Sequence, residues 1–143
     1  GLESPIDQDE LKRETQQAAR EMLAGQGILP GAIDGAWAKL SDAYFLRHTP
    51  EEVAWHTRVL AAHSGDSDEP VVSLQPENDR GTTAIMTYAP HRHHGFARST
   101  AVLEQLGLNI VDARITPTQD GNSLDLYHVL EDDGSAIDDM ERR

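Results

Sequence analysis

The sequence predicts an α+β fold, in which a helical N-terminal segment precedes a module of strands and one helix. Over the first sixty residues, apolar side chains recur at helical spacing. After residue 70 they instead occur in short runs that alternate with polar residues and are separated by turn-forming residues. Between these regions lies a polar, acidic stretch without periodicity. We therefore expect a helical segment over residues 1–63, a linker over 64–69 and a second module over 70–143.

Three helices are predicted in the first segment. The run from Asp7 to Leu23 has a thin apolar stripe, and Gly25 and Gly27 should end it. A second helix is predicted from Pro30 to Tyr44, because large apolar residues recur along one face of it. The third begins within Thr49–Glu52, where an N-cap threonine, a proline at the first helical position and a glutamate form a capping box.

Aromatic residues are concentrated in and around the second and third helices: Trp37, Tyr44, Phe45 and Trp55. They could form a recognition surface, but the interpretation we favour is that they pack the helices together or onto the second module. His48 and His56 lie near the same seam and are expected to be hydrogen-bonded structural residues.

The second module reads as β-α-β-β. Its predicted elements are a strand at Thr82–Tyr88, a helix at Phe96–Leu106 ended by Gly107, a strand at Asn109–Thr116 with Val111, Ala113 and Ile115 on one face, and a strand at Ser123–Leu130. A tight turn at Asp120–Gly121 joins the last two strands. This order is most of a ferredoxin-like β-α-β-β-α-β unit whose last strand is missing. We expect the additional strand Val71–Gln75 to occupy the vacant edge beside Thr82–Tyr88, or to lie at a dimer interface.

Composition excludes several functions. The 143 residues include no cysteine, which excludes disulfides and thiolate chemistry and fits a reducing cytoplasm. The net charge of −13 disfavours nucleic acid and anionic membrane surfaces as partners, and no run is long and apolar enough to span a bilayer. The sequence starts with Gly1 and ends within a helix-like run from Asp138, so we expect an excised piece of a longer chain.

Several motifs carry a resemblance to a known family. The run from Asp42 to Thr57 resembles the segment before the first ACT domain of the bacterial bifunctional uridylyltransferase/uridylyl-removing enzymes. Arg80–Thr83 is similar to that family's entry to its first ACT strand, and Leu108–Ile115 to its second strand. Asp120–Gly121 and Leu124–Asp125 match the hairpin and the third strand. Together these motifs cover about two-thirds of the chain in order.

The resemblance implies a regulatory function. Enzymes of this family have a nucleotidyltransferase domain, a metal-dependent HD phosphodiesterase domain and two ACT domains, and they act on the P-II nitrogen regulatory protein. The ACT domains are thought to sense L-glutamine. This chain would be the segment after the HD domain plus the first ACT domain, with the catalytic domains, the second ACT domain and P-II as partners of the parent. Mg²⁺ or another divalent metal would belong to the parent, and no cofactor, metal site or catalytic residue is expected in this piece.

The expected ligand site comprises five residues: His94, Gly95, Phe96, Asn109 and Ile110. In ACT domains a small ligand commonly lies between the loop after the first strand, the following helix start and a neighbouring subunit's second strand. Free backbone N–H groups at a helix start attract a carboxylate, and a glycine there allows close approach. The sequence departs from the family at His91, where an acidic residue is common.

Two alternatives remain open. His91, His93 and His94 resemble a metal cluster, but their spacing matches no established site and a solvated loop is the simpler interpretation. The module could also be a pure interaction domain that forms a homodimer or docks on the catalytic domains, since Ile85 and Met86 place apolar side chains on both faces of one strand.

Overall fold

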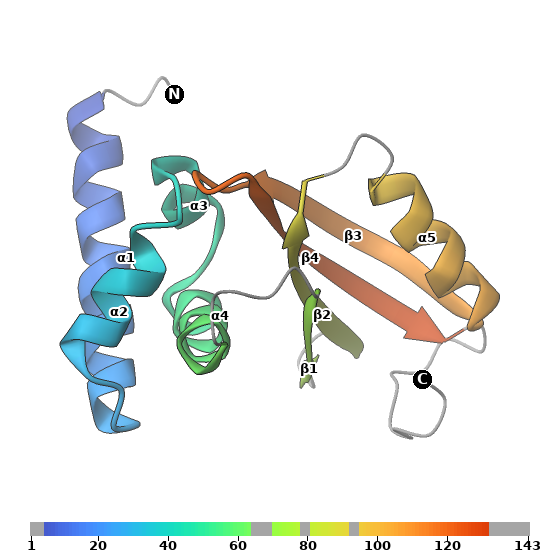
Figure 1. Cartoon of the computed structure of the whole chain (residues 1–143), viewed down its shortest axis with the longest axis horizontal. Helices are drawn as coiled ribbons and strands as arrows, with labels where there is room; N and C mark the ends of the chain where they lie inside the picture. The colour runs from blue at the N-terminus through green and yellow to red at the C-terminus, as the bar shows by residue number, and fades with distance from the viewer. Residues whose placement is uncertain (1–4, 64–69, 78–80, 92–94, 132–143) are drawn as a thin grey trace. The chain divides into compact units, whose positions relative to one another are not determined.

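The structure is a computed structural model that describes residues 5–63, 70–77, 81–91 and 95–131. The chain divides into two compact units (Figure 1): a helical unit of residues 1–67 with 118–120, and a sheet unit of residues 68–117 and 121–143. The expected linker over 64–69 lies outside the described residues. No helix among the described residues is long and apolar enough to cross a membrane.

The helical unit contains four helices: α1 (Pro5–Gly25), α2 (Pro30–Trp37), α3 (Asp42–Arg47) and α4 (Pro50–Ala62). Helix α1 contacts the other three, and α2 also contacts α4. The core of the unit consists of aliphatic and aromatic side chains that are at least nine-tenths buried, among them Leu23, Ile33, Trp37, Leu40, Tyr44, Phe45, Val53, Trp55 and Leu60. The Phe45 ring meets the rings of Trp37 and Tyr44 edge to face, with centroids 5.2 Å away in both cases. The predicted packing of the aromatic residues is therefore confirmed.

Helix α1 ends as its two glycines indicate. Gly27 has a φ of 81°, which a residue with a side chain rarely adopts. Its N–H donates to the Ala24 carbonyl, and the Ile28 N–H donates to the Leu23 carbonyl. These two bonds form a Schellman motif that satisfies the last carbonyls of the helix.

The prediction of one helix from Pro30 to Tyr44 is wrong, because the segment forms two helices. Helix α2 ends at Trp37, and α3 starts after Ser41, which has the extended backbone of an N-cap (φ −92°, ψ 166°). Ser41 is followed by Asp42 in the first turn of α3, where a carboxylate stabilises a helix start. The break keeps Trp37 and Tyr44 in the same core although they lie on different helices.

The capping box predicted at the start of α4 is confirmed. The Thr49 hydroxyl accepts a hydrogen bond from the Glu52 N–H at 3.1 Å, and the Glu52 carboxylate accepts one from the Thr49 N–H at 3.0 Å. Pro50 occupies the first helical turn, where its missing N–H costs nothing.

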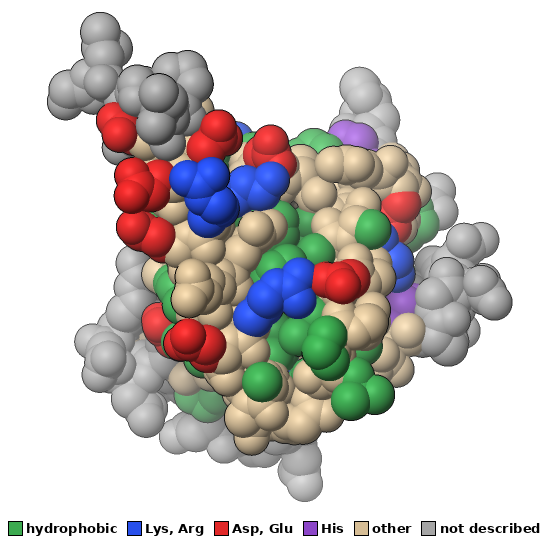
Figure 2. Space-filling view, turned by 90° about the vertical axis from the view of Figure 1, so that its left-hand side faces the viewer, with side chains coloured by type: hydrophobic (Ala, Val, Ile, Leu, Met, Phe, Trp, Pro, Cys, Tyr) green, Lys and Arg blue, Asp and Glu red, His purple; other side chains and the backbone are tan. Residues whose placement is uncertain are grey.

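Charged side chains on the helical unit form exposed pairs. Lys12 Nζ lies 2.6 Å from Asp42 Oδ1, and Arg20 Nη2 lies 2.5 Å from Asp34 Oδ1. The Arg20 guanidinium also lies over the Trp37 ring, 4.5 Å from its centroid. Figure 2, which faces this unit, shows basic and acidic side chains adjacent to one another around a hydrophobic patch. Because they are exposed, these ion pairs add little stability.

The sheet unit contains β1 (Val71–Glu77), β2 (Thr82–Pro90), α5 (Gly95–Gln105), β3 (Leu108–Pro117) and β4 (Asn122–Glu131). The strand order is β1-β2-β4-β3, and all neighbours are antiparallel. Helix α5 therefore connects two parallel strands that have β4 between them, and it lies along one face of the sheet (Figure 1). Gly121, with a φ of 82°, completes the predicted hairpin turn. The α+β prediction with its βαββ module is confirmed.

The extra strand occupies the predicted edge. Strand β1 pairs antiparallel with β2 over its whole length, from Val71 opposite Tyr88 to Glu77 opposite Thr82. This is the position that the last strand of a ferredoxin-like unit would take beside its first strand.

The core under α5 revises one prediction. Val111 was expected to share a face with Ala113 and Ile115, but the pairing of β3 with β4 shifts between Ile110 and Asp112. This irregularity leaves Val111 53% exposed, whereas Ile110 packs with Ala113 and Ile115 against the core. A β-bulge reverses the alternation in this way because it inserts one residue into one strand. The buried members of the core are Ile85, Leu108, Tyr127 and Val129.

Candidate functional site

The residues of the expected ligand site lie at the two ends of α5. Gly95 and Phe96 begin this helix, whereas Asn109 and Ile110 begin β3, which follows its C-terminal end. An α-helix of 11 residues places its ends about 15 Å apart, so one copy of the chain does not bring the two halves together. Ile110 packs against the core, Asn109 is exposed, and His94 lies outside the described residues.

Of the three histidines considered as a metal cluster, only His91 lies within the described residues. His91 follows β2, and its backbone N–H donates to the Gly121 carbonyl at 3.1 Å. His93 and His94 lie outside the described residues. Within the described part of the chain, no three histidine, aspartate or glutamate side chains are placed to hold a metal ion.

The sheet unit has a cavity of about 540 Å³ between α5 and the sheet, called the α5 cavity below. Its lining is mostly hydrocarbon and comes from four strands and the helix: Pro70, Val72, Ile85, Thr87, Ala89, Pro90, His91, Arg98, Ser99, Val102, Leu103, Ile115, Ser123, Asp125 and Tyr127. A concave, largely apolar space with a few convergent polar groups is the usual form of a small-molecule site.

The polar groups of the α5 cavity are organised around Asp125. The Ser123 hydroxyl donates to Asp125 Oδ1 at 2.5 Å, from the same face of β4. Burial raises the pKa of Asp125, although hydrogen bonds from Ser123 and the Thr116 backbone and the charge of His91 act in the opposite direction. Burial also raises the pKa of Tyr127. The cavity therefore holds a carboxylate whose charge its surroundings do not fully compensate.

Sequence reasoning did not identify Asp125 as a site residue. The available signal was the alternation along β4, which puts Ser123, Asp125 and Tyr127 on the face opposite to Leu124 and Leu126. An aspartate on a core-facing position of a strand is uncommon and indicates a partner or a function. Only the structure shows that α5 covers this same face of the sheet.

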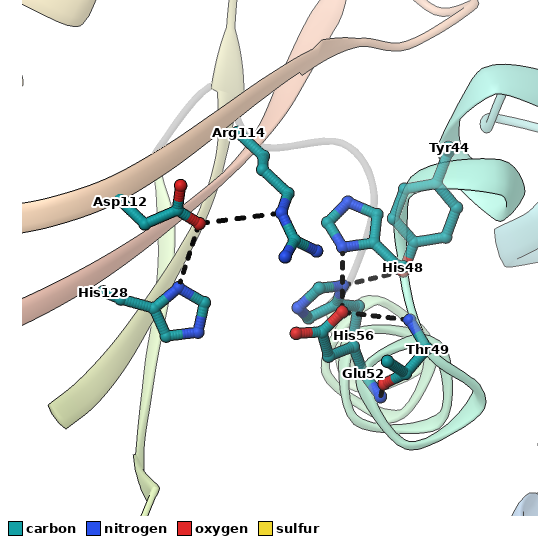
Figure 3. A network of polar contacts seen from close by, with 8 residues as sticks. All are labelled: Tyr44, His48, Thr49, Glu52, His56, Asp112, Arg114 and His128. Carbon is teal, nitrogen blue, oxygen red and sulfur yellow. Dashed lines mark hydrogen bonds and ion pairs between the residues drawn. The ribbon is translucent and has the colours of Figure 1, made fainter. Parts of the chain in front are cut away.

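The helical unit holds a buried polar cluster (Figure 3). The Tyr44 hydroxyl lies 2.7 Å from His56 Nδ1, and His48 Nδ1 lies 3.3 Å from a Glu52 carboxylate oxygen. Burial, together with the nearby His48, lowers the pKa of His56 to about 3, and burial raises that of Tyr44 well above its usual value. His56 and Tyr44 are therefore neutral at physiological pH and share one hydrogen bond. As predicted, both histidines are hydrogen-bonded structural residues.

Figure 3 also shows a second polar group, which belongs to the sheet unit. The Asp112 carboxylate lies 3.7 Å from Arg114 Nε and 3.6 Å from His128 Nδ1. Asp112 follows the β3 bulge, and its side chain is 43% exposed, so these contacts are screened by solvent.

Comparison with known proteins identifies the family. Residues 7–59 match the family model described as the uridylyltransferase GlnD fifth domain. The whole chain is 43% identical to the bifunctional uridylyltransferase/uridylyl-removing enzyme of Ectopseudomonas mendocina, 42% to that of Stutzerimonas stutzeri and 41% to that of Pseudomonas putida. The chain belongs to this enzyme family. It spans 16% of the length of each of these relatives, so it corresponds to one part of such an enzyme.

The family match extends the helical region that the sequence motifs indicated. The Asp42–Thr57 run falls inside the matched range, and the start of the match at residue 7 shows that α1 is part of the same family segment. The relatives align with both units of the structure, because they cover the complete chain.

Proposed function

We propose that this chain is the glutamine-sensing regulatory segment of a uridylyltransferase/uridylyl-removing enzyme that acts on the P-II nitrogen regulatory protein. The supporting observation is that relatives with this name align with the entire chain, which folds as a helical unit followed by an ACT-like βαββ module. The nucleotidyltransferase and phosphodiesterase chemistry, with Mg²⁺ or another divalent metal, would lie in other parts of the parent enzyme.

Glutamine would act through differential affinity. If the ACT-like module binds glutamine more tightly when the parent enzyme is in its UMP-removing state, glutamine shifts the population toward that state. The ligand carboxylate would lie at the start of α5, near Gly95 and Phe96, where backbone N–H groups lack helical partners. Asn109 and Ile110 of a second copy, or the corresponding strand of the second ACT domain, would complete the site, because one copy separates the two halves.

The test is an NMR titration of ¹⁵N-labelled protein with L-glutamine, with D-glutamine and L-glutamate as controls. We expect saturable shifts for L-glutamine only, centred on Gly95 and Asn109. Asn109→Ala should weaken these shifts, whereas Gln105→Ala, a change at an exposed position of α5, should not. Sedimentation in the presence of glutamine should show a dimer if a second copy completes the site.

A second candidate function is an interaction module without a metabolite. It is favoured by the sheet, where Ile85, Tyr127 and Val129 lie on one face of the central strands, while Met86 and Leu126 lie on the other. A dimer that forms without glutamine, together with no glutamine shifts in a folded protein, would favour this alternative over the sensor.

A further inference from the structure

The helical unit includes the tip of the β3–β4 hairpin, residues 118–120, although the strands on either side of it belong to the sheet unit. Gln119 bonds this tip to the segment between α2 and α3. Its backbone N–H donates to the Lys39 carbonyl at 2.8 Å, and its side-chain amide donates to the Leu40 carbonyl at 3.1 Å. One residue, 79 positions from Leu40 in the sequence, therefore holds two consecutive carbonyls of that segment.

The segment between the two helices, residues 38–41, is called the α2–α3 connection below. It places Leu40 in the core of the unit, where this side chain is 4% exposed. The N–H groups of Lys39 and Leu40 donate back to carbonyls at the end of α2. Carbonyls beyond a helix end need donors from outside the helix. Gln119 supplies two such donors, so its bonds fix the path of the connection.

The hairpin tip is tied closely to its two strands. Pro117 ends β3 immediately before the tip, and its ring restricts the backbone there. Gly121 follows the tip with a φ of 82°, and within the tip the Thr118 hydroxyl donates to the Asp120 carboxylate. Because each residue has only two soft backbone torsions, a turn this short has little capacity to absorb a movement of β3 or β4. Such a movement therefore reaches Gln119.

We propose that the hairpin tip is a mechanical link between the sheet unit and the helical unit, in which Gln119 couples a change in β3 or β4 to the α2–α3 connection. Strand β3 gives this link a regulatory use, because it has Asn109 and Ile110 at its start and leads into the tip at its end. Coupling of this kind is a free energy shared by two sites, and a double-mutant cycle measures it. The proposal does not depend on which ligand the sheet unit binds.

Gln119→Glu tests the link, because a carboxylate keeps the size of the side chain but cannot donate to the Leu40 carbonyl. The amides of Leu40 and Tyr44, called the reporter amides below, donate to carbonyls on either side of the connection, and NMR follows their hydrogen exchange. We expect both to exchange about fivefold faster in the variant, as for the loss of an ordinary hydrogen bond. Gln17→Glu, which adds the same charge at an exposed position of α1, is the matched control and should leave exchange unchanged.

The coupling itself is measured by disturbing the sheet unit at a distance from the tip. Val129 lies toward the other end of β4 and is fully buried in the core under α5, so Val129→Ala destabilises the sheet unit without changing the tip. We expect this substitution to speed exchange of the reporter amides at least about twofold when Gln119 is present. It should have no effect on them in the Gln119→Glu protein. The Ile28 amide, which closes the end of α1, should be unaffected in all four proteins of the cycle.

The proposal is overturned if Gln119→Glu and Gln17→Glu have the same effect on the reporter amides. It is also overturned if Val129→Ala changes their exchange equally in the presence and absence of the Gln119 amide, or changes it in neither protein. If circular dichroism shows that Val129→Ala is unfolded, Ile85→Val takes its place, because it removes one carbon from the same core. None of these measurements uses a ligand, so they bear on the link and not on the glutamine site.

Discussion

The two units differ in the partners and the charge of their buried polar side chains. In the helical unit, several buried polar groups are bonded to each other: the Trp37 indole N–H donates to the Thr57 hydroxyl at 2.9 Å, and Thr57 in turn donates to the Val53 carbonyl, whereas the Nε2 atoms of His48 and His56 are buried without a hydrogen-bond partner. In the sheet unit, the α5 cavity contains a carboxylate with a raised pKa and is lined by an exposed arginine. Bonded polar pairs fix the packing of a core, whereas an incompletely compensated charge in a cavity marks a candidate functional group.

This contrast separates stability from ligand recognition. Substitutions of buried polar or aromatic residues in the helical unit should destabilise the protein strongly. They should leave small-molecule binding in the sheet unit unchanged. The cavity residues should behave in the opposite way. The predictions below test that separation, beginning with the largest expected effect.

Truncation of Trp37 should destabilise the protein most. Its side chain is 8% exposed, contacts Phe45 and bonds to Thr57, so Trp37→Ala removes core packing and leaves the Thr57 hydroxyl without this partner. We expect a loss of about 3–5 kcal/mol in the free energy of unfolding, measured by urea denaturation. Leu29→Ala is the control, because Leu29 is 72% exposed, and its effect should stay within about 0.5 kcal/mol.

His56 should make the protein lose stability as the pH falls. Burial lowers its pKa to about 3 in the folded state, whereas a histidine ordinarily has a pKa of 6.5, so the unfolded chain binds the proton first. Stability from this residue is therefore complete above pH 6.5 and decreases through the window from 6.5 to 3, by about 1.4 kcal/mol per pH unit.

The measurement compares urea denaturation of the protein and of His56→Gln at pH 7.5 and pH 4.5. The native protein should lose about 2–3 kcal/mol more than the variant between these two pH values. Equal losses would show that His56 is accessible to protons in the folded state and that the helical unit is not the closed, neutral region described here.

Removal of the α4 capping box should have a smaller effect. Thr49→Ala eliminates the bond from the Thr49 hydroxyl to the Glu52 N–H and should cost about 1 kcal/mol. Ser41→Ala is a matched control, since Ser41 is also an N-cap but its side chain makes no capping bond. If both substitutions cost the same, intrinsic propensity and not the capping bond accounts for the effect.

The sequence predicted elements whose determinants are local. The capping box at Thr49, the glycine stop at Gly27 and the turn at Gly121 each depend on a few neighbouring residues, and all three were predicted. The helix break before Asp42 also had a local signal, the Ser41–Asp42 pair, but the apolar periodicity from Ile33 to Tyr44 concealed it.

Two features set by tertiary packing were not predicted. The bulge at Val111 follows from pairing with β4 and has no signal in β3 alone. The α5 cavity requires the helix, the edge strand β1 and alternate residues of β4 to meet, so the partly buried position of Asp125 in it became visible only in the structure. The expected ligand residues at Gly95 and Asn109 were placed by family resemblance, and the length of α5 separates them within one copy.

The smallest predicted change in stability is also the sharpest test of the contrast between the units. Because burial raises the folded-state pKa of Asp125 above the ordinary aspartate value of 3.8, the folded protein binds a proton more readily than the unfolded chain. At pH values at which Asp125 is ionised, its buried charge destabilises the fold. Asp125→Asn should therefore slightly stabilise the protein at pH 7. The gain should disappear as the pH falls below 3.8, where both states hold the proton. Stabilisation of the protein by Asp125→Asn in urea denaturation at pH 7 would show that the buried charge opposes folding; a destabilised Asp125→Asn would instead assign this carboxylate to the structural network of β4.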